Sequence, residues 1–319
     1  MIRAFGLRDG LAVHLLQRDG VWLDLFHHLL LRRSALQMAL LAPVPWVGAG
    51  LASYVWTQRR QPQAFVQLLK RPRRQEADLL FMAPSLNRQP HSALAWQELL
   101  RMCAAEAAAQ GLRRLFASLP EQRPELDMMT AQGWTTYTTE EVFVLAKSAR
   151  RQPLMPNRAL RPRQEKDVWW LRRLYSLSTP PPVQHAEGYT SDDDLTLLPL
   201  AWWEMTNQSS FVVEEKGDVL GGVQLVSGHR GHWLLLHGDP GNAALMTDLL
   251  RYGVAAAGDS RWPIYCAVRA YQGGLDAVVR AHGFASHARR SRLIKHLAVR
   301  VKAVEPAPVL NLVTQGPGS

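Results

Sequence analysis

Two polar loops in this chain each lead directly into a segment predicted to be a helix. The first loop spans residues 84–90 and precedes a helix expected at 92–110. The second loop spans residues 238–242 and precedes a helix expected at 243–257. The start of a helix presents backbone N–H groups that lack intrahelical partners, and it carries a partial positive charge. Both loops are therefore suited to bind an anionic ligand.

The first loop belongs to a longer unit of alternating strands and helices. Apolar residues 77–83 form a strand candidate before the loop, and the helix after it is stopped by Gly111. A short apolar run at 112–117 follows, and then a second helix that opens near residue 121 and ends at Gly133-Trp134. This order predicts a β-α-β-α unit whose first loop faces the amino end of a helix.

The second half of the chain repeats this unit. Leu99-Leu100-Arg101 recurs as Leu249-Leu250-Arg251, and Gly133-Trp134 recurs as Gly283-Phe284, at a separation of 150 residues in both cases. Because self-similarity at a fixed spacing indicates a repeated architecture, we expect two copies of one domain.

The expected domain boundaries follow from composition. We place a first domain at residues 1–147, a linker rich in Pro and Arg at 148–166, and a second domain at 158–304 that overlaps the end of the linker. A disordered tail is expected at 305–319. The linker has no apolar periodicity, which favours a solvated connector over an anion-binding patch.

Composition is that of a globular protein with a strong positive charge. The chain has 319 residues, 47% of them hydrophobic and 20% charged, with a net charge of +10 and a pI near 10. A net positive charge attracts phosphorylated cofactors, nucleic acid and acidic lipid alike, so it does not indicate which of them is bound. The two cysteines, Cys103 and Cys266, lie in apolar runs, which indicates buried thiols in a reducing, cytoplasmic setting and no disulfide framework or metal site.

One uncharged segment has the length of a membrane span. Residues 34–58 carry no charged side chain and are flanked by pairs of arginines. Pro43, Pro45, Gly48 and Gly50 fall in its middle, where they break a helix. The segment therefore favours a buried helix–turn–strand over a membrane helix, and no secretory signal peptide is recognised at the start.

The other expected elements complete each half. In the first half they are strands at 2–8 and 12–17, a helix at 21–41, a hairpin of strands at 53–58 and 63–71, and a closing pair of strands at 135–139 and 140–147. In the second half they are a helix at 167–176, an irregular segment at 179–194, a helix at 195–205, strands at 211–215, 222–227, 232–237 and 263–268, and a closing pair at 286–289 and 291–301.

This order of elements resembles the GNAT superfamily of N-acyltransferases, and the repeat resembles a tandem double-GNAT protein. Three kinds of sequence segment are most similar to the family: residues 76–82, the helix that ends at Gly111 with the apolar residues 112–116 after it, and the pairs Gly133-Trp134 and Gly283-Phe284. The resemblance implies an α/β (α+β) fold of two acyl-CoA N-acyltransferase-like domains. Each would have a mixed, mostly antiparallel sheet flanked by helices.

The resemblance also implies where acetyl-CoA or another acyl-CoA binds. In this family the fourth and fifth strands part, the pantetheine arm lies along the fourth strand, and the pyrophosphate sits on the next helix start. The implied cofactor residues are Met82, Ala83, Pro84, Ser85, Arg88 and Ser92 in the first copy, and Leu236, His237, Gly238, Asp239, Pro240, Gly241, Asn242 and Ala243 in the second.

The glycines of the family's phosphate loop are displaced or missing. Their positions fall on Leu94 and Trp96 in the first copy, which has no glycine between residues 76 and 110. The second copy has Ala244 and Met246 there, but it keeps Gly238 and Gly241 just upstream, where they can form a related cradle of N–H groups. The second copy is therefore the better candidate for cofactor binding.

Candidate catalytic residues are few. The family's frequent general acid, a tyrosine, falls on Met129 and Val279; Tyr265 and Tyr271 lie near that region of the second copy, although a buried tyrosine with a structural partner is the commoner case. A base is also needed, because a free amine has a pKa of about 10. Candidate bases are Asp78, which is otherwise read as a solvent-facing strand residue, and His237, otherwise a hydrogen-bonding histidine at a loop end.

Three functions remain open on these grounds. The first is an acyl-CoA-dependent N-acyltransferase, acting on a small-molecule or peptide amine, with one copy degenerate. The second is an inactive GNAT-like protein that binds a ligand or serves in assembly. The third is nucleic-acid binding, which the charge favours but which no recognised motif accompanies. The sequence does not define an oligomeric state.

Overall fold

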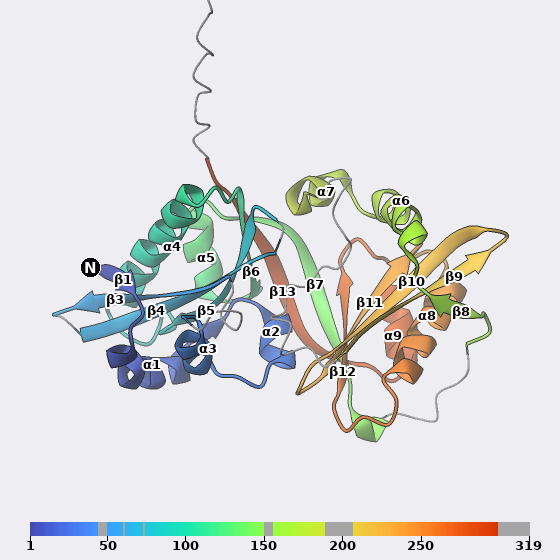
Figure 1. The fold of residues 1–319 in the computed structure, drawn as a ribbon, viewed down its shortest axis with the longest axis horizontal. Coiled ribbons are helices and arrows are strands. Elements are labelled where there is room, and N and C mark those ends of the chain that lie inside the picture. Colours follow the sequence, from blue (N-terminus) through green and yellow to red (C-terminus); the bar gives the residue numbers. More distant parts are fainter. Residues whose placement is uncertain (44–49, 60, 73, 150–155, 189–206, 299–319) are drawn as a thin grey trace, which may run out of the picture.

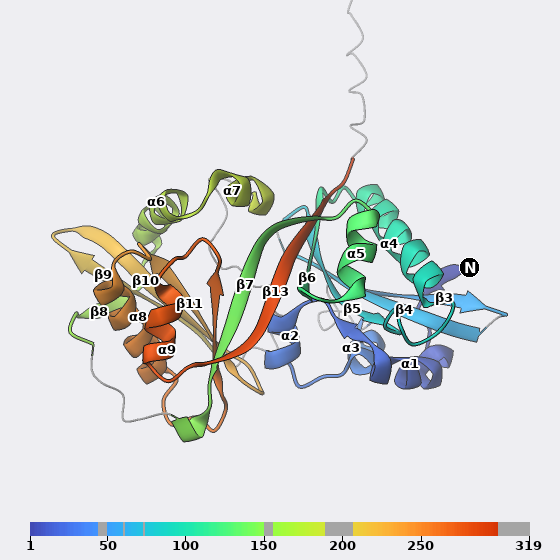
Figure 2. The same ribbon diagram turned by 180° about the vertical axis from the view of Figure 1, so that it is seen from behind.

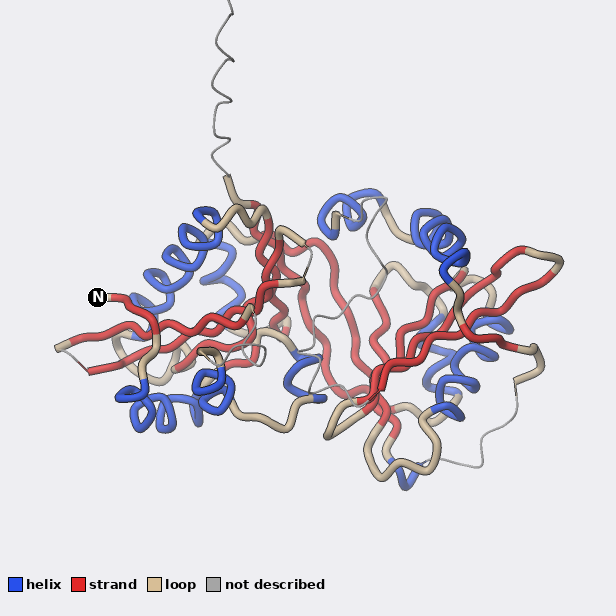
Figure 3. Tube along the Cα trace, viewed as in Figure 1, coloured by secondary structure: helices blue, strands red, loops and turns tan. Residues whose placement is uncertain are grey.

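The computed structural model describes residues 1–43, 50–59, 61–72, 74–149, 156–188 and 207–298. Its strands form one continuous 13-stranded sheet, and helices cover both faces of that sheet (Figure 1). Figure 2 shows the arrangement from behind, and in Figure 3 the strands, in red, run from one end of the molecule to the other. The predicted fold class, a mixed and mostly antiparallel sheet flanked by helices, is confirmed.

The elements have the following bounds. In the first half the strands are β1 (Ile2–Ala4), β2 (Val21–Trp22), β3 (Leu51–Gln58), β4 (Gln61–Lys70), β5 (Glu76–Ala83), β6 (Arg114–Pro120) and β7 (Thr135–Leu145), and the α-helices are α1 (Gly10–Leu16), α2 (Leu25–Leu30), α3 (Ala35–Leu41), α4 (Ser92–Ala109) and α5 (Pro124–Ala131). In the second half the strands are β8 (Leu160–Pro162), β9 (Asn207–Glu215), β10 (Asp218–Ser227), β11 (His232–Gly238), β12 (Ile264–Arg269) and β13 (Ala285–His296), and the α-helices are α6 (Val168–Ser178), α7 (Pro181–Glu187), α8 (Ala243–Ala256) and α9 (Leu275–Ala281).

The order of strands across the sheet is β1-β3-β4-β5-β6-β13-β7-β12-β11-β10-β9-β8, with β2 alongside β5. All pairs are antiparallel except β5 with β6 and β11 with β12. These two parallel pairs occupy equivalent places in the two halves, as the repeat predicted. Each connects through a long crossover helix, α4 or α8, as parallel neighbours require.

The two halves exchange their closing strands. β13, the last strand of the chain, lies between β6 and β7 of the first half, while β7 pairs with β12 of the second half. The prediction of two short closing strands in each half is wrong, because β7 and β13 are each one long strand. Neither contains a Gly or Pro to end it, and the two strands pair with each other along most of their length.

Three other local predictions are wrong. Residues predicted as a strand at 12–17 lie mostly in α1, since a short apolar run does not separate strand from helix. The single helix predicted at 21–41 is divided into β2, α2 and α3, because Asp24 and Ser34 each cap a new helix start. The segment 179–194, predicted to be irregular, contains α7, which has proline in its first turn.

Further predictions concern the linker, a helix before β9, the tail and a membrane span. The linker at 148–166 contains β8, which pairs with β9. The helix expected at 195–205 and the tail expected at 305–319 lie outside the described residues. Across the part of the chain that the structure describes, no helix combines the length and apolarity needed to cross a membrane.

A shared core ties the halves together beneath the centre of the sheet. Phe26 of α2, Val142 of β7 and Trp233 of β11 belong to one cluster of buried side chains. The rings of Phe26 and Trp233 meet edge to face with centroids 5.3 Å apart. This cluster contains residues of both halves, and two of its members, Phe26 and Trp233, line a cavity formed by both halves.

Candidate active site

The sheet opens between β11 and β12 in the second half. The two strands pair in parallel only where His232, Trp233 and Leu234 face Ile264, Tyr265 and Cys266, and then they part. Alternate residues of a strand direct their backbone groups to opposite sides, and the His232 N–H points toward β12, where it donates to Pro263. The backbone groups of Leu236 and Gly238 therefore face the gap.

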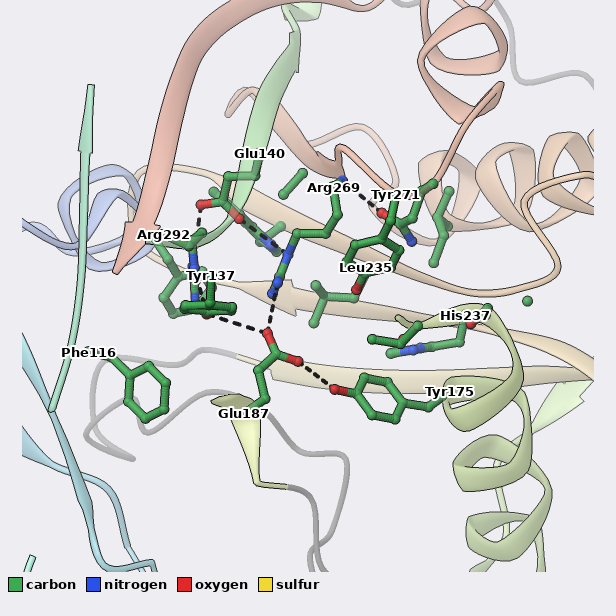
Figure 4. Close-up of a pocket in the computed structure, with 18 of the residues that line it drawn as sticks. Phe116, Tyr137, Glu140, Tyr175, Glu187, Leu235, His237, Arg269, Tyr271 and Arg292 are labelled. Atoms are coloured by element: carbon green, nitrogen blue, oxygen red, sulfur yellow. Dashed lines mark hydrogen bonds and ion pairs between the residues drawn. The ribbon is translucent and has the colours of Figure 1, made fainter. Parts of the chain in front are cut away.

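A cavity of about 120 Å³ lies in this gap (Figure 4). Its walls come from β11, β12, the α6–α7 region, the loop after β12 and the first half of the chain. The lining residues include Leu236, His237 and Gly238 from β11, Arg269 and Tyr271 from β12 and its following loop, Tyr175 and Glu187 from α6 and α7, Arg71, Phe116, Tyr137 and Glu140 from the first half, and Arg292 from β13.

The start of α8 lies directly beyond the β11 end of this cavity. Asn242 caps the helix by accepting a hydrogen bond from Leu245 N–H (3.1 Å), and the Asp239 carboxylate accepts one from Gly241 N–H (2.9 Å). Gly241, Asn242, Ala243 and Ala244 are all exposed. The predicted residues from Leu236 to Ala243 are thus brought together, three on the cavity wall and the rest in the loop that leads to the helix start.

The equivalent gap in the first half holds the protein's own backbone. β5 and β6 also part after a short parallel contact, but β2 lies against β5 there, with Val21 opposite Met82 and Trp22 opposite Phe81. Leu23 then bridges the two parted strands, because its N–H donates to Leu80 (2.8 Å) and its carbonyl accepts from Ser118 (2.7 Å).

Arg290 completes this filling from the other half of the chain. Its guanidinium donates to the Ser118 hydroxyl (2.9 Å), to the Trp22 carbonyl (2.8 Å) and to the Ser118 carbonyl. Burial lowers the pKa of Arg290 to about 10, so the side chain stays charged at neutral pH. The strand exchange therefore brings a charged group into the place where the second half keeps its cavity.

The predicted cofactor residues of the first half are engaged within the protein. Met82, Ala83 and Ser92 are buried, and Ser85 donates its N–H to Asp19 (2.7 Å). Arg88 forms an exposed ion pair with Asp19 (3.0 Å). The remaining member, Pro84, accepts a hydrogen bond from the Trp96 indole (2.7 Å), and the N–H of the next loop residue, Leu86, donates to the buried Glu125 carboxylate (3.1 Å).

A network of charged and phenolic groups lines the cavity of the second half. Glu187 accepts from Arg269 (2.7 Å), Tyr175 (2.8 Å) and Tyr137 (3.4 Å). Burial opposes ionisation of Glu187, but Arg269 and the other donors outweigh it and lower the pKa of this carboxyl. Glu187 is therefore a carboxylate at neutral pH.

Arginines from the first half fix the end of α7 that carries Glu187. Arg114 donates to the Ala186 carbonyl (3.3 Å) and Arg74 donates to the Glu187 carbonyl (2.8 Å). Gly188 ends the helix with φ of 59°, and a Cβ atom there would lie 1.5 Å from the Arg114 guanidinium. Glycine is favoured here by its left-handed conformation, and a side chain would also displace the Arg114 guanidinium.

Two predicted catalytic residues, His237 and Tyr271, lie on the cavity wall. Burial, with Arg163 nearby, lowers the pKa of His237 to about 4, so its imidazole is neutral at pH 7. Burial raises the pKa of Tyr271, so its phenol keeps its proton. The site thus offers a neutral imidazole and a protonated phenol.

The other two predicted catalytic residues lie outside the cavity wall. Tyr265 is on the same strand as Arg269 but packs between the rings of Trp233 and His287, with centroids 6.3 and 5.5 Å away. Asp78 forms a two-bond ion pair with Arg71 (2.8 and 2.7 Å) and is 6% exposed. The reading of Asp78 as a solvent-facing residue is therefore wrong.

Acidification is expected to destabilise the protein partly through His237. The unfolded chain binds a proton at this residue below pH 6.5 but the folded chain only below about 4, so stability falls as pH drops through that window. From pH 7 to pH 5 this residue should account for at most about 2 kcal/mol of lost stability. Urea unfolding at the two pH values measures it. His237→Gln should lose less stability than wild type over this interval, and an equal loss would contradict the assignment, since other histidines contribute alike to both proteins.

Comparison with solved structures identifies the fold. A tandem GNAT protein from the clavulanic acid biosynthesis pathway has a TM-score of 0.54 at 10% identity, over 94% of this chain and 99% of its own. A GCN5-related N-acetyltransferase from Sphaerobacter thermophilus has a TM-score of 0.54 at 14% identity, over 93% and 95%. A putative acetyltransferase from Pyrococcus horikoshii has a TM-score of 0.52 at 10% identity, over 95% and 91%. No family model and no curated protein sequence matches the chain.

The chain therefore has the fold of the GNAT superfamily in its tandem arrangement, and the resemblance predicted from the sequence is confirmed. At these identities the likeness defines the fold, and the function has to be argued from the site.

Proposed function

We propose that the protein is an acyl-CoA-dependent N-acyltransferase with a single working site, between β11 and β12 of the second half. The observation that carries this proposal is the contrast between the two gaps. One holds a cavity whose wall ends at Gly238, just before the loop that leads to the exposed start of α8, and the other is filled by Val21, Trp22, Leu23 and Arg290.

The residues of the second half fit an acyl-CoA on physical grounds. The backbone groups of Leu236 and Gly238 face the gap and have no strand partner there among the residues that the structure describes, which suits the amide groups of a pantetheine arm. The exposed amides at the start of α8, around Ala243 and Ala244, suit a pyrophosphate. When bound, such a molecule supplies an activated acyl thioester.

The chain's own groups then handle protons. Tyr271 keeps its phenolic proton and is assigned to donate it to the leaving sulfur. His237, with a pKa of about 4, is too weak a base to deprotonate an ammonium group whose pKa is about 10. We therefore assign His237 to accept a hydrogen bond from an amine that reacts in its neutral form, and the proton that this amine releases on acylation returns to the Tyr271 phenolate.

The acceptor in this proposal is a small-molecule or peptide amine, and the setting is the cytoplasm. Cys103 and Cys266 are both buried free thiols, which a reducing compartment favours. Acetyl-CoA is the proposed donor, because the solved structures that share this fold include an N-acetyltransferase.

A negative charge at the start of α8 should weaken binding of CoA. Ala244→Asp is expected to raise the Kd of desulfo-CoA about tenfold or more, since a carboxylate there repels the pyrophosphate. The matched control is Ala93→Asp, because Ala93 is likewise the exposed second residue of α4. Both variants should fold, since an acidic residue stabilises a helix start. Calorimetry on the full chain measures the Kd values.

Pantetheine, which lacks the phosphates, should bind wild type and Ala244→Asp equally. A larger rise in the Kd of desulfo-CoA in Ala93→Asp than in Ala244→Asp would contradict the choice of the second half. Absence of CoA binding at millimolar ligand would remove the proposal. CoA binding without thiol release across a panel of amines would leave an inactive GNAT-like binding protein, and a salt-dependent gel shift in place of CoA binding would favour nucleic acid.

A further inference from the structure

Arg269 and Arg292 bring two guanidinium groups to one wall of the cavity, and each has a nitrogen to spare (Figure 4). In Arg269, Nη1 donates to Glu187 (2.7 Å) and Nε faces Glu140 (3.5 Å). In Arg292, Nη1 faces Glu140 (3.3 Å) and Nε donates to Tyr137 (3.3 Å). Among the described residues, neither Nη2 has a hydrogen-bond partner. Two sets of charged N–H donors therefore remain for a ligand.

The charge that this wall presents to the cavity is mostly positive. The side chains of Arg269 and Arg292 are 19% and 25% exposed, whereas those of Glu187 and Glu140 are 9% and 4% exposed. The carboxylates are thus enclosed by their partners, and the guanidinium groups keep the accessible surface. The Arg71 guanidinium also lies on this cavity, 4.2 Å over the Phe116 ring, but its charge is paired with Asp78 and Glu76.

We propose that the acceptor is an amine that also carries a carboxylate, which binds to the Nη2 groups of Arg269 and Arg292. The inference rests on the proposed function, since it names the acceptor of that same site. Guanidinium groups bind carboxylates through paired, charge-assisted hydrogen bonds, and planar forks of this kind give geometric selectivity as well as energy. An amine without a carboxylate leaves those donors unpaired in an enclosed site.

The size of the cavity limits how much of the acceptor it encloses. Its volume of about 120 Å³ is below the roughly 150 Å³ of a cavity that binds benzene. A head group with one amine and one carboxylate is of this size, and any larger body must extend beyond the cavity. The rings of Phe116, Tyr137, Tyr175 and Tyr271 on the wall suit an apolar stem next to the head group.

Matched amines test this assignment directly on the full chain. Alanine is compared with ethylamine, and phenylalanine with phenethylamine, so that each pair differs only in the carboxylate. Without any CoA, the carboxylate members should raise the melting temperature by about 2 °C or more at saturating concentration, and their partners should not. With acetyl-CoA, thiol release should show a kcat/KM at least about tenfold higher for the carboxylate members.

Two arginine variants on β13 locate the effect. Arg292→Lys keeps a positive charge beside Glu140 but removes the fork, so the preference for the carboxylate member should fall about tenfold. Arg289→Lys is the control, because Arg289 is 64% exposed and pairs with Glu141 away from this cavity; its preference should equal that of wild type.

The outcomes separate the inference from the proposed function. Equal melting shifts and equal rates within each pair would overturn the inference while transfer itself continued. Preference for O-phosphoethanolamine over β-alanine would overturn the choice of carboxylate over phosphate. Loss of the preference in Arg289→Lys but not in Arg292→Lys would overturn the assigned residues. Failure of desulfo-CoA to bind would instead remove the proposed function, and the melting shifts would still decide whether the arginines bind a carboxylate.

Discussion

Removal of the last strand is expected to abolish folding of the whole chain, not of the second half alone. A protein ending at residue 284 lacks β13, which pairs with β6 on one side and β7 on the other. Leu293 and Ile294 on β13 are 0% and 3% exposed, and the loss of each large buried aliphatic side chain costs about 2–5 kcal/mol. Together with the hydrogen bonds of two lost strand pairings, this loss is comparable to a typical free energy of unfolding of about 5–15 kcal/mol.

The matched control ends at residue 298 and therefore keeps every described strand. It should show cooperative thermal unfolding by circular dichroism, and the shorter protein should show none. Fragments 1–147 and 156–298 should likewise be unfolded apart and form one folded particle when expressed together. A well-folded fragment 1–147 on its own would show that the exchange of strands is not needed, and would contradict the sheet order given above.

Tyr271→Phe is expected to lower kcat by about 10²-fold or more while the Kd for desulfo-CoA stays within twofold. The phenol of Tyr271 lies on the cavity wall and keeps its proton at neutral pH. A positioned general acid typically contributes about 10²–10⁴-fold to the rate. Because phenylalanine keeps the ring, the packing of the loop after β12 should be preserved. Steady-state thiol release with acetyl-CoA and the best amine of the panel measures kcat.

Tyr265→Phe serves as the control for this prediction. Tyr265 lies on β12 but outside the cavity wall, packed against the rings of Trp233 and His287. Its loss of a hydroxyl should leave kcat within about twofold of wild type. If Tyr265→Phe lost activity and Tyr271→Phe did not, the proton donor would have to be assigned to the other tyrosine.

The sequence was informative wherever the local pattern alone decides the structure. The strand at Glu76–Ala83 and the helix at Ser92–Ala109 agree with expectation to within a residue, because a continuous apolar run and helical periodicity specify them locally. The loop at residues 238–242 was also placed correctly at the start of a helix. The strand-helix-strand order of both halves followed from the repeat.

Features that depend on distant partners were not predictable from local pattern. β13 lies beside β6, more than 160 residues away along the chain, as the bonds from Arg290 to Ser118 show. The part of the first gap's filling that Arg290 supplies depends on that same exchange. The only local signal was the interruption at Asp19-Gly20, where Gly20 is needed because a Cβ atom would lie 2.0 Å from the Phe81 ring.

Most of the cavity's polar groups were missed for the same reason. Tyr137, Glu187, Arg269 and Arg292 come from four separate elements and acquire their relation only through packing. Glu187 had one weak signal, its position just before Gly188, since glycine commonly ends a helix. The sequence also favoured the second half for cofactor binding, because Gly238 and Gly241 remain there and the first half has no glycine in that loop. The cavity lies in that half, and cofactor binding there stays a prediction.

Backbone hydrogen exchange on the full chain, with and without desulfo-CoA, tests most directly whether one half alone binds the ligand. We predict that exchange slows at residues 236–246, which span the end of β11 and the start of α8, and is unchanged at residues 80–95. Slowing confined to residues 80–95, or equal slowing in both segments, would contradict the account.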